Sequence, residues 1–537
     1  MPKITIDGRE LEVPEGKTVI QAAFDNGMFI PHYCWHPGLS PEGNCRMCLV
    51  EIEKAPKLMP SCTTAVADGM AVKTDKTSEK VKAAQKDVME FLLVDHPIDC
   101  PICDQAGECK LQDFYMSYDA QPSRVPLDAK LHKPKRTSFS DQIVYDAERC
   151  ILCTRCVRFC NEVTQTGELG MFNRGAVSLI GLQEGQQLAG EYQGNLADIC
   201  PVGALTHQDF RFKKRVWFLS GAKSVCAGCS KGCNIQIDYD REQVFRYRPR
   251  FNGDVNQYWM CDEGRLSYKS VHAEGRALVP YLRRGGDKPE RSDWKTALER
   301  TAGVLSLLAK QGGSASVAAV GSPLSSTEEN YLLKCLWNMA FPGAPVAFPP
   351  ETLYHEGKGD KILKTPDKSP NASVGKALGI SSTSLDSILT GIEQGKIKGL
   401  YLLGDDLLER RGAHQALSGR LEKAISKLSW LAVQSPFLHA TARSAHAVLP
   451  AAHHAECEGT FINVDRRVQR FVPSIPPPVE ARAGIEILQD LARHLGHEVP
   501  AGGAANVFDH LAASEKAFQG LSWKDLGDQG AMLPGQT

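Results

Sequence analysis

Cysteine residues are concentrated in the first half of the chain. Sixteen of the eighteen lie between Cys34 and Cys261, and most fall in short groups spaced by two or three residues. In a reducing compartment, such groups indicate ligands of metal ions or iron–sulfur clusters rather than disulfide bonds. The first half of the chain is therefore expected to fold around several metal centres.

Two sets of candidate ligands come first. The spacing C-x10-C-x2-C-x13-C supplies four thiolates, which can hold either zinc or a 2Fe–2S cluster; a predicted hairpin and helix beside a long ligand loop favour the cluster. The second set, in HPIDCPICDQAGEC, begins with a histidine, and its spacing leaves zinc and a 4Fe–4S cluster equally open. An imidazole in place of a thiolate tends to raise the reduction potential of a cluster. These sets are Cys34, Cys45, Cys48 and Cys62, and His96, Cys100, Cys103 and Cys109.

Two further sets follow along the chain. The run ERCILCTRCVRFC has the C-x2-C-x2-C-x3-C spacing of bacterial ferredoxins, in which a proline follows the last cysteine. Here Asn161 follows Cys160, whereas Cys200 precedes a proline, so we assign Cys200 rather than Cys160 as the fourth ligand of a 4Fe–4S cluster. The last set could hold structural zinc, but the ferredoxin-like sites upstream favour another 4Fe–4S cluster. These sets are Cys150, Cys153, Cys156 and Cys200, and Cys226, Cys229, Cys233 and Cys261.

Residue patterns predict how these sets are organised. Residues 3–13 alternate around Asp7-Gly8 and predict a hairpin, residues 18–27 a helix that stops at Gly27, and residues 78–97 an amphipathic helix. Beyond about residue 270, short apolar strands alternate with longer helical patterns, which predicts α/β layering. We expect a loose tail after residue 500. We also expect the neighbouring histidines 453 and 454 at the surface or in a loop rather than as a metal pair.

Composition excludes several classes of function. The formal net charge is −1, so no electrostatic footprint for nucleic acid is present. No apolar run is long enough to cross a bilayer, and the N-terminus lacks the pattern of a signal peptide. These features predict a soluble, cytoplasmic protein that contacts a membrane only through its partners.

The ordered motifs, from Cys34 through His96 and CILCTRCVRFC to MCDEGR, resemble the large iron–sulfur subunit (the G subunit in bacteria) of NADH:quinone oxidoreductase, which is respiratory complex I. The resemblance covers about the first 275 residues, and AHAVLPAAHHAECEGTFINVDRRVQRF is similar to the molybdopterin-oxidoreductase-like region of that family. It implies a relay of electrons from NADH and FMN through iron–sulfur clusters toward quinone, coupled in the whole complex to proton translocation. The chain would act as a subunit of this translocase without catalytic residues of its own.

The resemblance also implies a multidomain α+β and α/β fold. The expected domains are a β-grasp 2Fe–2S ferredoxin-type domain over 1–78, a His(Cys)3-ligated 4Fe–4S domain over 79–118, a 4Fe–4S ferredoxin-like domain over 140–215, a 4Fe–4S domain of the Mo/W bis-MGD type over 219–275 and a molybdopterin-oxidoreductase-like α/β domain without an active site over 276–537.

The implied cofactors are one 2Fe–2S cluster, two 4Fe–4S clusters and a third 4Fe–4S cluster at the last cysteine set, without molybdopterin. The implied partners are other peripheral-arm subunits of complex I: the FMN/NADH-binding subunit, a 2Fe–2S subunit and the quinone-module subunits. The implied location is peripheral, on the cytoplasmic side of the inner (plasma) membrane.

Two departures from the molybdenum enzymes of the wider superfamily indicate a lost catalytic site. Those enzymes usually carry a lysine two residues after the last cluster cysteine, where this chain has Glu263, and the α/β region here is short. The main alternative is the molybdenum-containing subunit of an NAD-dependent formate dehydrogenase. The diaphorase-side relay of an NAD-linked hydrogenase and a non-redox zinc scaffold are further alternatives.

Overall fold

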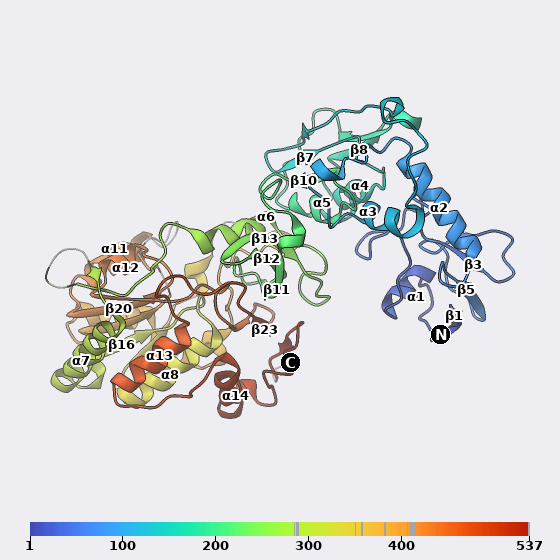
Figure 1. Cartoon of the computed structure of the whole chain (residues 1–537). Coiled ribbons are helices and arrows are strands. Elements are labelled where there is room, and N and C mark those ends of the chain that lie inside the picture. Colours follow the sequence, from blue (N-terminus) through green and yellow to red (C-terminus); the bar gives the residue numbers. More distant parts are fainter. Residues whose placement is uncertain are drawn as a thin grey trace. The chain divides into compact units, whose positions relative to one another are not determined.

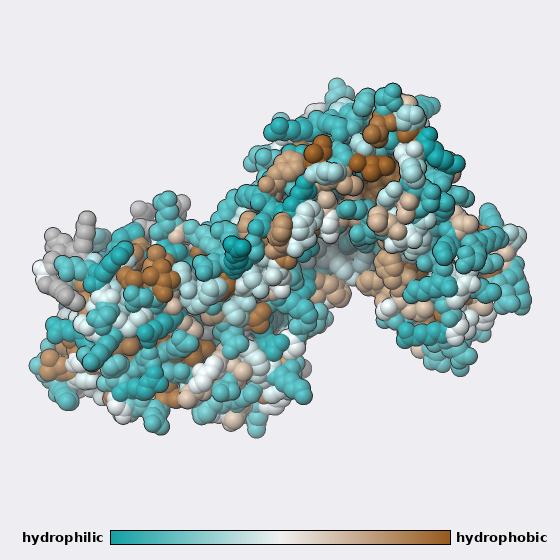
Figure 2. Space-filling view, in the orientation of Figure 1, coloured by the Kyte–Doolittle hydropathy of each residue, from teal (hydrophilic) through white to brown (hydrophobic). Residues whose placement is uncertain are grey.

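The computed structural model describes residues 1–283, 285, 289–349, 351–355, 358–380, 383–404, 406–408 and 415–534. The chain forms two compact units, Met1–Leu219 and Ser220–Thr537 (Figure 1). Hydrophilic residues cover most of the visible surface, and hydrophobic residues lie on it in scattered patches (Figure 2). Among the described residues, every helix is too short or too polar to cross a bilayer.

The first unit begins with a five-stranded sheet in the order β2-β1-β5-β3-β4. Its strands are β1 (Lys3–Ile6), β2 (Arg9–Glu12), β3 (Leu49–Ile52), β4 (Met59–Pro60) and β5 (Met70–Lys73). Strands β1 and β2 form the predicted hairpin. Helix α1 (Val19–Asp25) starts at a capping box between Thr18 and Gln21 and buries Val19 and Ile20 in the core under the sheet. The loop between α1 and β3 carries the first three cysteines of the chain.

The predicted amphipathic helix is α2 (Glu79–Leu93), which begins at the Ser78 cap and buries Val81, Met89 and Leu93 on one face. It is followed by η1 (Cys100–Ile102), α3 (Lys110–Phe114), η2 (Tyr115–Asp119) and η3 (Leu127–Ala129). The chain therefore turns sharply after α2, and the second ligand set lies in this turn.

The rest of the first unit surrounds the ferredoxin-like run. Strands β6 (Thr137–Ser138), β7 (Ile143–Tyr145) and β10 (Leu205–His207) form one small sheet, and β8 (Leu169–Phe172) pairs with β9 (Leu179–Leu182). The helical segments are α4 (Arg155–Arg158), η4 (Phe159–Val163), η5 (Gly175–Val177), α5 (Gly194–Ile199) and η6 (Val216–Phe218).

The second unit opens with an antiparallel sheet of β11 (Ser220–Val225), β12 (Asn234–Asp240) and β13 (Gln243–Pro249). Helix α6 (Asp262–Leu266) and the turn η7 (Ser267–His272) follow. The last ligand set lies in the β11–β12 connection and at the start of α6.

An eight-stranded sheet forms the centre of the second unit, in the order β15-β14-β21-β20-β19-β16-β17-β18. Its parallel strands are β16 (Val317–Val320), β17 (Val346–Phe348), β18 (Thr383–Ser384), β19 (Gly399–Leu403), β20 (Trp430–Ser435) and β21 (Ala447–Pro450). The antiparallel edge consists of β14 (Tyr281–Leu282) and β15 (Glu290–Arg291).

Helices cover both faces of this sheet. Figure 1 shows α8 and α13 on one side of β16 and β20, and α11 and α12 on the other. The helices are α7 (Trp294–Gly312), α8 (Thr327–Ala340), α9 (Val374–Ala377), α10 (Leu385–Glu393), α11 (Gln415–Ile425), α12 (Ala440–Ser444), α13 (Gly484–His494) and α14 (Ala504–Ser514), with short turns η8 (Ser314–Ser316), η9 (Glu351–Tyr354) and η12 (Lys516–Phe518). The side chains of successive strand residues pack into the two hydrophobic cores on opposite faces of the sheet, Leu400 on one face and Tyr401 on the other. The predicted α/β layering is confirmed, because a parallel sheet must be buried on both faces.

The C-terminal segment is not the loose tail that its composition predicts. Helix α14 buries Val507, Phe508 and Leu511 in the same core as α8, and β24 (Ala531–Met532) pairs with β23 (Arg467–Phe471), which pairs with β22 (Gly459–Ile462). The prediction was wrong because three apolar residues at helical spacing decide the packing of this glycine- and alanine-rich segment.

Candidate functional site

The first ligand set, site 1, consists of Cys34, Cys45, Cys48 and Cys62. The backbone N–H of Cys34 donates to Cys45 Sγ at 3.4 Å. The thiols of Cys45 and Cys62 donate to the Cys34 sulfur and lower its pKa, and the Cys48 sulfur also lies beside that of Cys62. The structure therefore brings all four sulfur atoms together in a largely buried position.

The second ligand set, site 2, lines a cavity of about 150 Å³. Its ligands are His96, Cys100, Cys103 and Cys109, and the apolar lining includes Leu93 and Met116. Burial is the main cause that lowers the pKa of His96 to about 4, so its imidazole is neutral at pH 7, as a metal ligand requires. The Ile98 backbone N–H donates to Nδ1 of His96 at 3.1 Å. Burial raises the pKa of Cys109 to about 12, so this thiol stays protonated at pH 7 unless a metal binds it.

The third ligand set, site 3, surrounds a small cavity lined by Cys150, Cys153, Cys156 and Cys200. Positive φ angles at Leu152 (52°) and Thr154 (58°) curl the loop so that successive cysteines face one space. Cys160 does not line this cavity. It is buried elsewhere, and its carbonyl accepts from the backbone N–H groups of Thr166 and Gly167. The structure thus gathers Cys200, rather than Cys160, with the other three.

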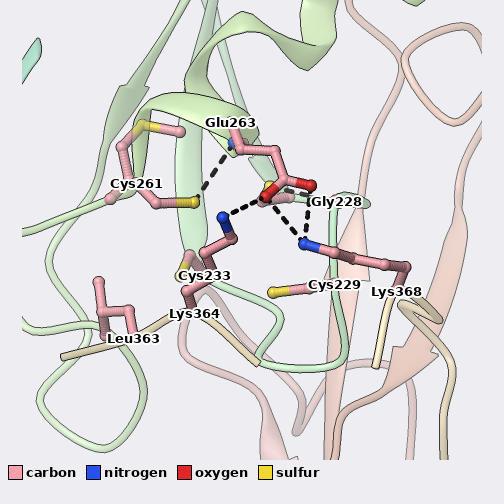
Figure 3. A pocket seen from close by; sticks show the side chains of 11 residues that line it. Gly228, Cys229, Cys233, Cys261, Glu263, Leu363, Lys364 and Lys368 are labelled. Carbon is pink, nitrogen blue, oxygen red and sulfur yellow. Dashed lines mark hydrogen bonds and ion pairs between the residues drawn. The ribbon is translucent and has the colours of Figure 1, made fainter. Parts of the chain in front are cut away.

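The fourth ligand set, site 4, lines a cavity drawn in Figure 3 with Cys226, Cys229, Cys233 and Cys261. The Cys226 N–H donates to the Cys233 carbonyl at 2.8 Å, which closes the loop between β11 and β12. A Cβ on Gly264 would lie 2.9 Å from Cys226 Sγ and 3.4 Å from Cys261 Sγ, so the helix start approaches the sulfur atoms as only glycine allows. Among the described residues, no group of His, Cys, Asp or Glu closes tightly enough to hold a single metal ion.

Two buried arginines lie between sites 1 and 3, and their surroundings show whether these sites fit anionic clusters. Arg155 and Arg158 are only 4% and 6% exposed. Arg155 donates to the carbonyls of Trp35 (2.5 Å) and Ile199 (3.0 Å). Arg158 donates to the carbonyls of the ligands Cys34 (2.5 Å) and Cys153 (3.2 Å).

The charges of these arginines have little compensation from carboxylates. Within the described part of the chain, Arg155 forms no ion pair, and the one ion pair of Arg158 is with the half-exposed Glu42 at 3.7 Å. A buried positive charge is costly unless a negative charge accompanies it. Thiolate-ligated clusters at sites 1 and 3 would supply that charge, so the residues present fit such clusters.

The neighbouring histidines 453 and 454 lie in a loop, one of the two positions expected for them, but His453 is buried and His454 is half-buried rather than exposed. His453 is 8% exposed, its ring lies 4.4 Å from that of His454, and its Nε2 is 3.1 Å from Ser270 Oγ. Burial lowers the pKa of His454 to about 4. Both rings are therefore neutral packing groups, in a loop that joins two buried strands.

Four basic residues near the sites were not among the predicted site residues: Arg155, Arg158, Lys364 and Lys368. Spacing gives a weak signal for the arginines, because the run CTRCVR interleaves them with ligands. No local signal marks the lysines, which lie about a hundred residues beyond the site that they line.

Comparisons with known proteins give a series of family models that match the chain in the same order as the four ligand sets. Five family models match: "2Fe-2S iron-sulfur cluster binding domain" at 2–77, "NADH-ubiquinone oxidoreductase-G iron-sulfur binding region" at 85–124, "NADH-quinone oxidoreductase subunit 3, ferredoxin-like domain" at 140–206, "Molybdopterin oxidoreductase Fe4S4 domain" at 220–273 and "Molybdopterin oxidoreductase" at 369–494.

Curated relatives match more than half of the chain at about 40% identity. The G subunit of NADH-quinone oxidoreductase from Rickettsia felis is 41% identical over 63% of this chain and 49% of the relative, and that from Streptomyces coelicolor is 41% identical over 58% and 36%. A chain of a solved NAD+-reducing [NiFe]-hydrogenase is 28% identical, with a TM-score of 0.36, over 40% of this chain and 91% of that chain. The chain spans about half or less of the length of these curated relatives. It is a homologue of the G subunit of NADH-quinone oxidoreductase, with a 2Fe–2S domain, 4Fe–4S binding regions and a molybdopterin-oxidoreductase-like region.

Proposed function

We propose that this chain is an electron-transfer subunit of NADH:quinone oxidoreductase. Electrons from NADH and FMN on a partner subunit would pass through its clusters toward quinone, coupled to proton translocation in the whole complex. The observation that carries the proposal is the convergence of four separate ligand sets, two of which share a pair of buried guanidinium groups. Such a role requires redox centres in sequence and no substrate pocket.

We assign one 2Fe–2S cluster to site 1 and one 4Fe–4S cluster to each of sites 2, 3 and 4, without molybdopterin. The domain division at 1–78, 79–118, 140–215, 219–275 and 276–537 is part of the same proposal. Each cluster supplies a one-electron couple when it is bound. The residues of the chain bury the ligands, exclude water with an apolar lining, and set the local charge that tunes each potential.

The proposed partners are the other peripheral-arm subunits: the FMN/NADH-binding subunit, a 2Fe–2S subunit and the quinone-module subunits. The proposed location is peripheral, on the cytoplasmic side of the inner (plasma) membrane. Membrane contact would come only through the complex.

Anaerobic purification followed by iron and sulfide analysis and EPR of the reduced chain tests the proposal. We expect about 14 iron atoms per chain and signals from one binuclear and three cubane clusters. Zinc without iron would instead support a structural scaffold, and stoichiometric molybdenum with formate oxidation would support the dehydrogenase alternative.

A matched pair of variants tests the ligand assignment at site 3. Cys200→Ser should remove the signal of one cubane cluster, because it deletes a sulfur atom that lines the cavity. Cys160→Ser should leave all signals in place, because this thiol lies outside that cavity. The reverse result would refute the assignment of Cys200.

A further inference from the structure

Three charged side chains line site 4, as Figure 3 shows. Glu263 comes from the first turn of α6, and Lys364 and Lys368 come from residues 360–368, called here the lysine segment. Lys368 Nζ lies 2.7 and 2.8 Å from the two carboxylate oxygens of Glu263, and Lys364 Nζ lies 3.1 Å from one of them. Both ammonium groups thus meet on one carboxylate beside four cysteines.

The two lysines are held close to the ligand loop rather than exposed to solvent. Their side chains are 15% and 14% exposed, whereas that of Glu263 is 46% exposed. The lysine segment is tied to Ser230, which lies between two ligand cysteines. The Ser230 N–H donates to the Asp367 carbonyl at 2.9 Å, and Ser230 Oγ lies 2.9 Å from Thr365 Oγ1.

A capped turn further limits the movement of the segment. Asp360 Oδ1 accepts from the backbone N–H groups of Ile362, Leu363 and Lys364 at 2.8, 2.9 and 3.1 Å. The backbone that carries Lys364 is therefore ordered on one side by this turn and on the other by the ligand loop. The backbone of the lysine segment is therefore held beside the loop that carries three of the four cysteines.

The net charge of this group decides its effect. Among the described residues that line the cavity, two ammonium groups and one carboxylate give a net positive charge. A 4Fe–4S cluster with four thiolate ligands is anionic and gains one more negative charge on reduction. A fixed positive charge nearby stabilises the reduced form more than the oxidised form, more strongly in a partly dry site than in water.

Building on the proposed function, we propose that Lys364 and Lys368 are positioning residues that raise the reduction potential of the cluster at site 4. Glu263 holds the two ammonium groups at the cavity without cancelling their charge. The molybdopterin-oxidoreductase-like region thereby contributes to the electron-accepting property of site 4 through its lysine segment.

Potentiometric EPR titration of the intact chain, with iron counted in every sample, tests this inference. Lys364→Met and Lys368→Met should each make reduction of this cluster about tenfold less favourable, which lowers its midpoint by about 59 mV for a one-electron couple. Lys364→Arg and Lys368→Arg keep the charge and should keep the midpoint. Lys361→Met, on an exposed residue of the same segment that does not line the cavity, is the matched control and should change nothing.

Each other outcome has a definite meaning. A filled site 4 whose midpoint does not move in the methionine variants overturns the inference and leaves the proposed function intact. An empty site 4 in the unaltered chain overturns the inference together with the cluster assignment at that site. Loss of the cluster in methionine but not arginine variants supports the need for positive charge, whereas loss in both overturns it, because the lysines would then be needed for shape.

Discussion

Arg158 offers the sharpest test of how the chain tunes neighbouring clusters. Its guanidinium donates to the carbonyls of Cys34 and Cys153, which are ligands in two different sites, and also to the carbonyl of Ser40. Arg158→Met keeps much of the side-chain packing and removes the charge. We therefore expect the potentials of both clusters, at sites 1 and 3, to fall together.

The size of this effect follows from the short hydrogen bonds. A guanidinium 2.5 Å from a ligand carbonyl lies a few bonds from the sulfur of the same residue. Coulomb's law at an effective dielectric constant of about 20 and a charge-to-cluster distance of about 8 Å gives about 2 kcal/mol. For a one-electron couple this energy corresponds to a decrease of about 90 mV in midpoint potential.

Stability and potential can be separated with a second variant. Arg158→Met also leaves buried carbonyls without their donor, at a cost of about 1–3 kcal/mol for each such group. Arg158→Lys keeps the charge but loses the planar fork that reaches several carbonyls, so it should lower stability and preserve both potentials. Arg174→Met, at an exposed residue of the same unit, is the control.

The assay is a potentiometric EPR titration of samples with full iron content. Unchanged midpoints in Arg158→Met with both clusters intact would show that the buried charge does not act on them. A decrease at only one site would refute the idea of a shared cation. Equal decreases in Arg158→Met and Arg158→Lys would attribute the effect to geometry rather than charge.

Three further predictions test other sites. His96→Cys should keep the cluster at site 2 and lower its midpoint, because a thiolate adds negative charge to it; an unchanged midpoint in EPR would argue against histidine ligation. Gly264→Ala should reduce the iron content by one cubane, since its Cβ would meet a ligand sulfur at 2.9 Å, whereas Gly275→Ala has open space and should be silent. Burial raises the pKa of Glu328 from 4.5 to about 7, so the unfolded state ionises first and the free energy of unfolding should fall by about 3 kcal/mol between about pH 4.5 and pH 7; Glu328→Gln should flatten that profile in denaturant titrations.

The N-terminal hairpin and the parallel strands could be predicted because their signals are local. Alternation around Asp7-Gly8 specifies a turn, and an apolar strand such as Gly399–Leu403 must be covered on both faces. Helix α14 was missed because its composition resembles that of a linker. Its packing depends on Phe508 and Leu511 meeting a core built by distant helices, which no local window contains.

The grouping of the cysteines could be predicted for the same reason, since short spacings confine several of their side chains to one loop. Their charged neighbours could not. Arg158 reaches a carbonyl 124 residues away, and Lys368 reaches a carboxylate 105 residues away. The burial of His453 in its loop could not be predicted, because the diverging directions of adjacent side chains argue against a shared metal but give no information on solvent exposure.

Positively charged groups lie beside sites 2, 3 and 4. At site 3, with four thiols, the charged lining residue is Arg155, and at site 4, also with four thiols, two lysines outnumber one carboxylate. At site 2 a neutral imidazole replaces one thiol, and the lining residue Asp99 pairs with Arg149 at 2.5 Å and with Lys135 at 3.5 Å, so cations lie beside this site as well. Four thiolate ligands make either a zinc ion or a 4Fe–4S cluster anionic, so cations beside the ligands are expected for both. The two differ in that only the cluster takes up a further electron. The midpoint shift in Arg158→Met therefore separates the relay from the zinc scaffold, because a zinc site has no midpoint to shift.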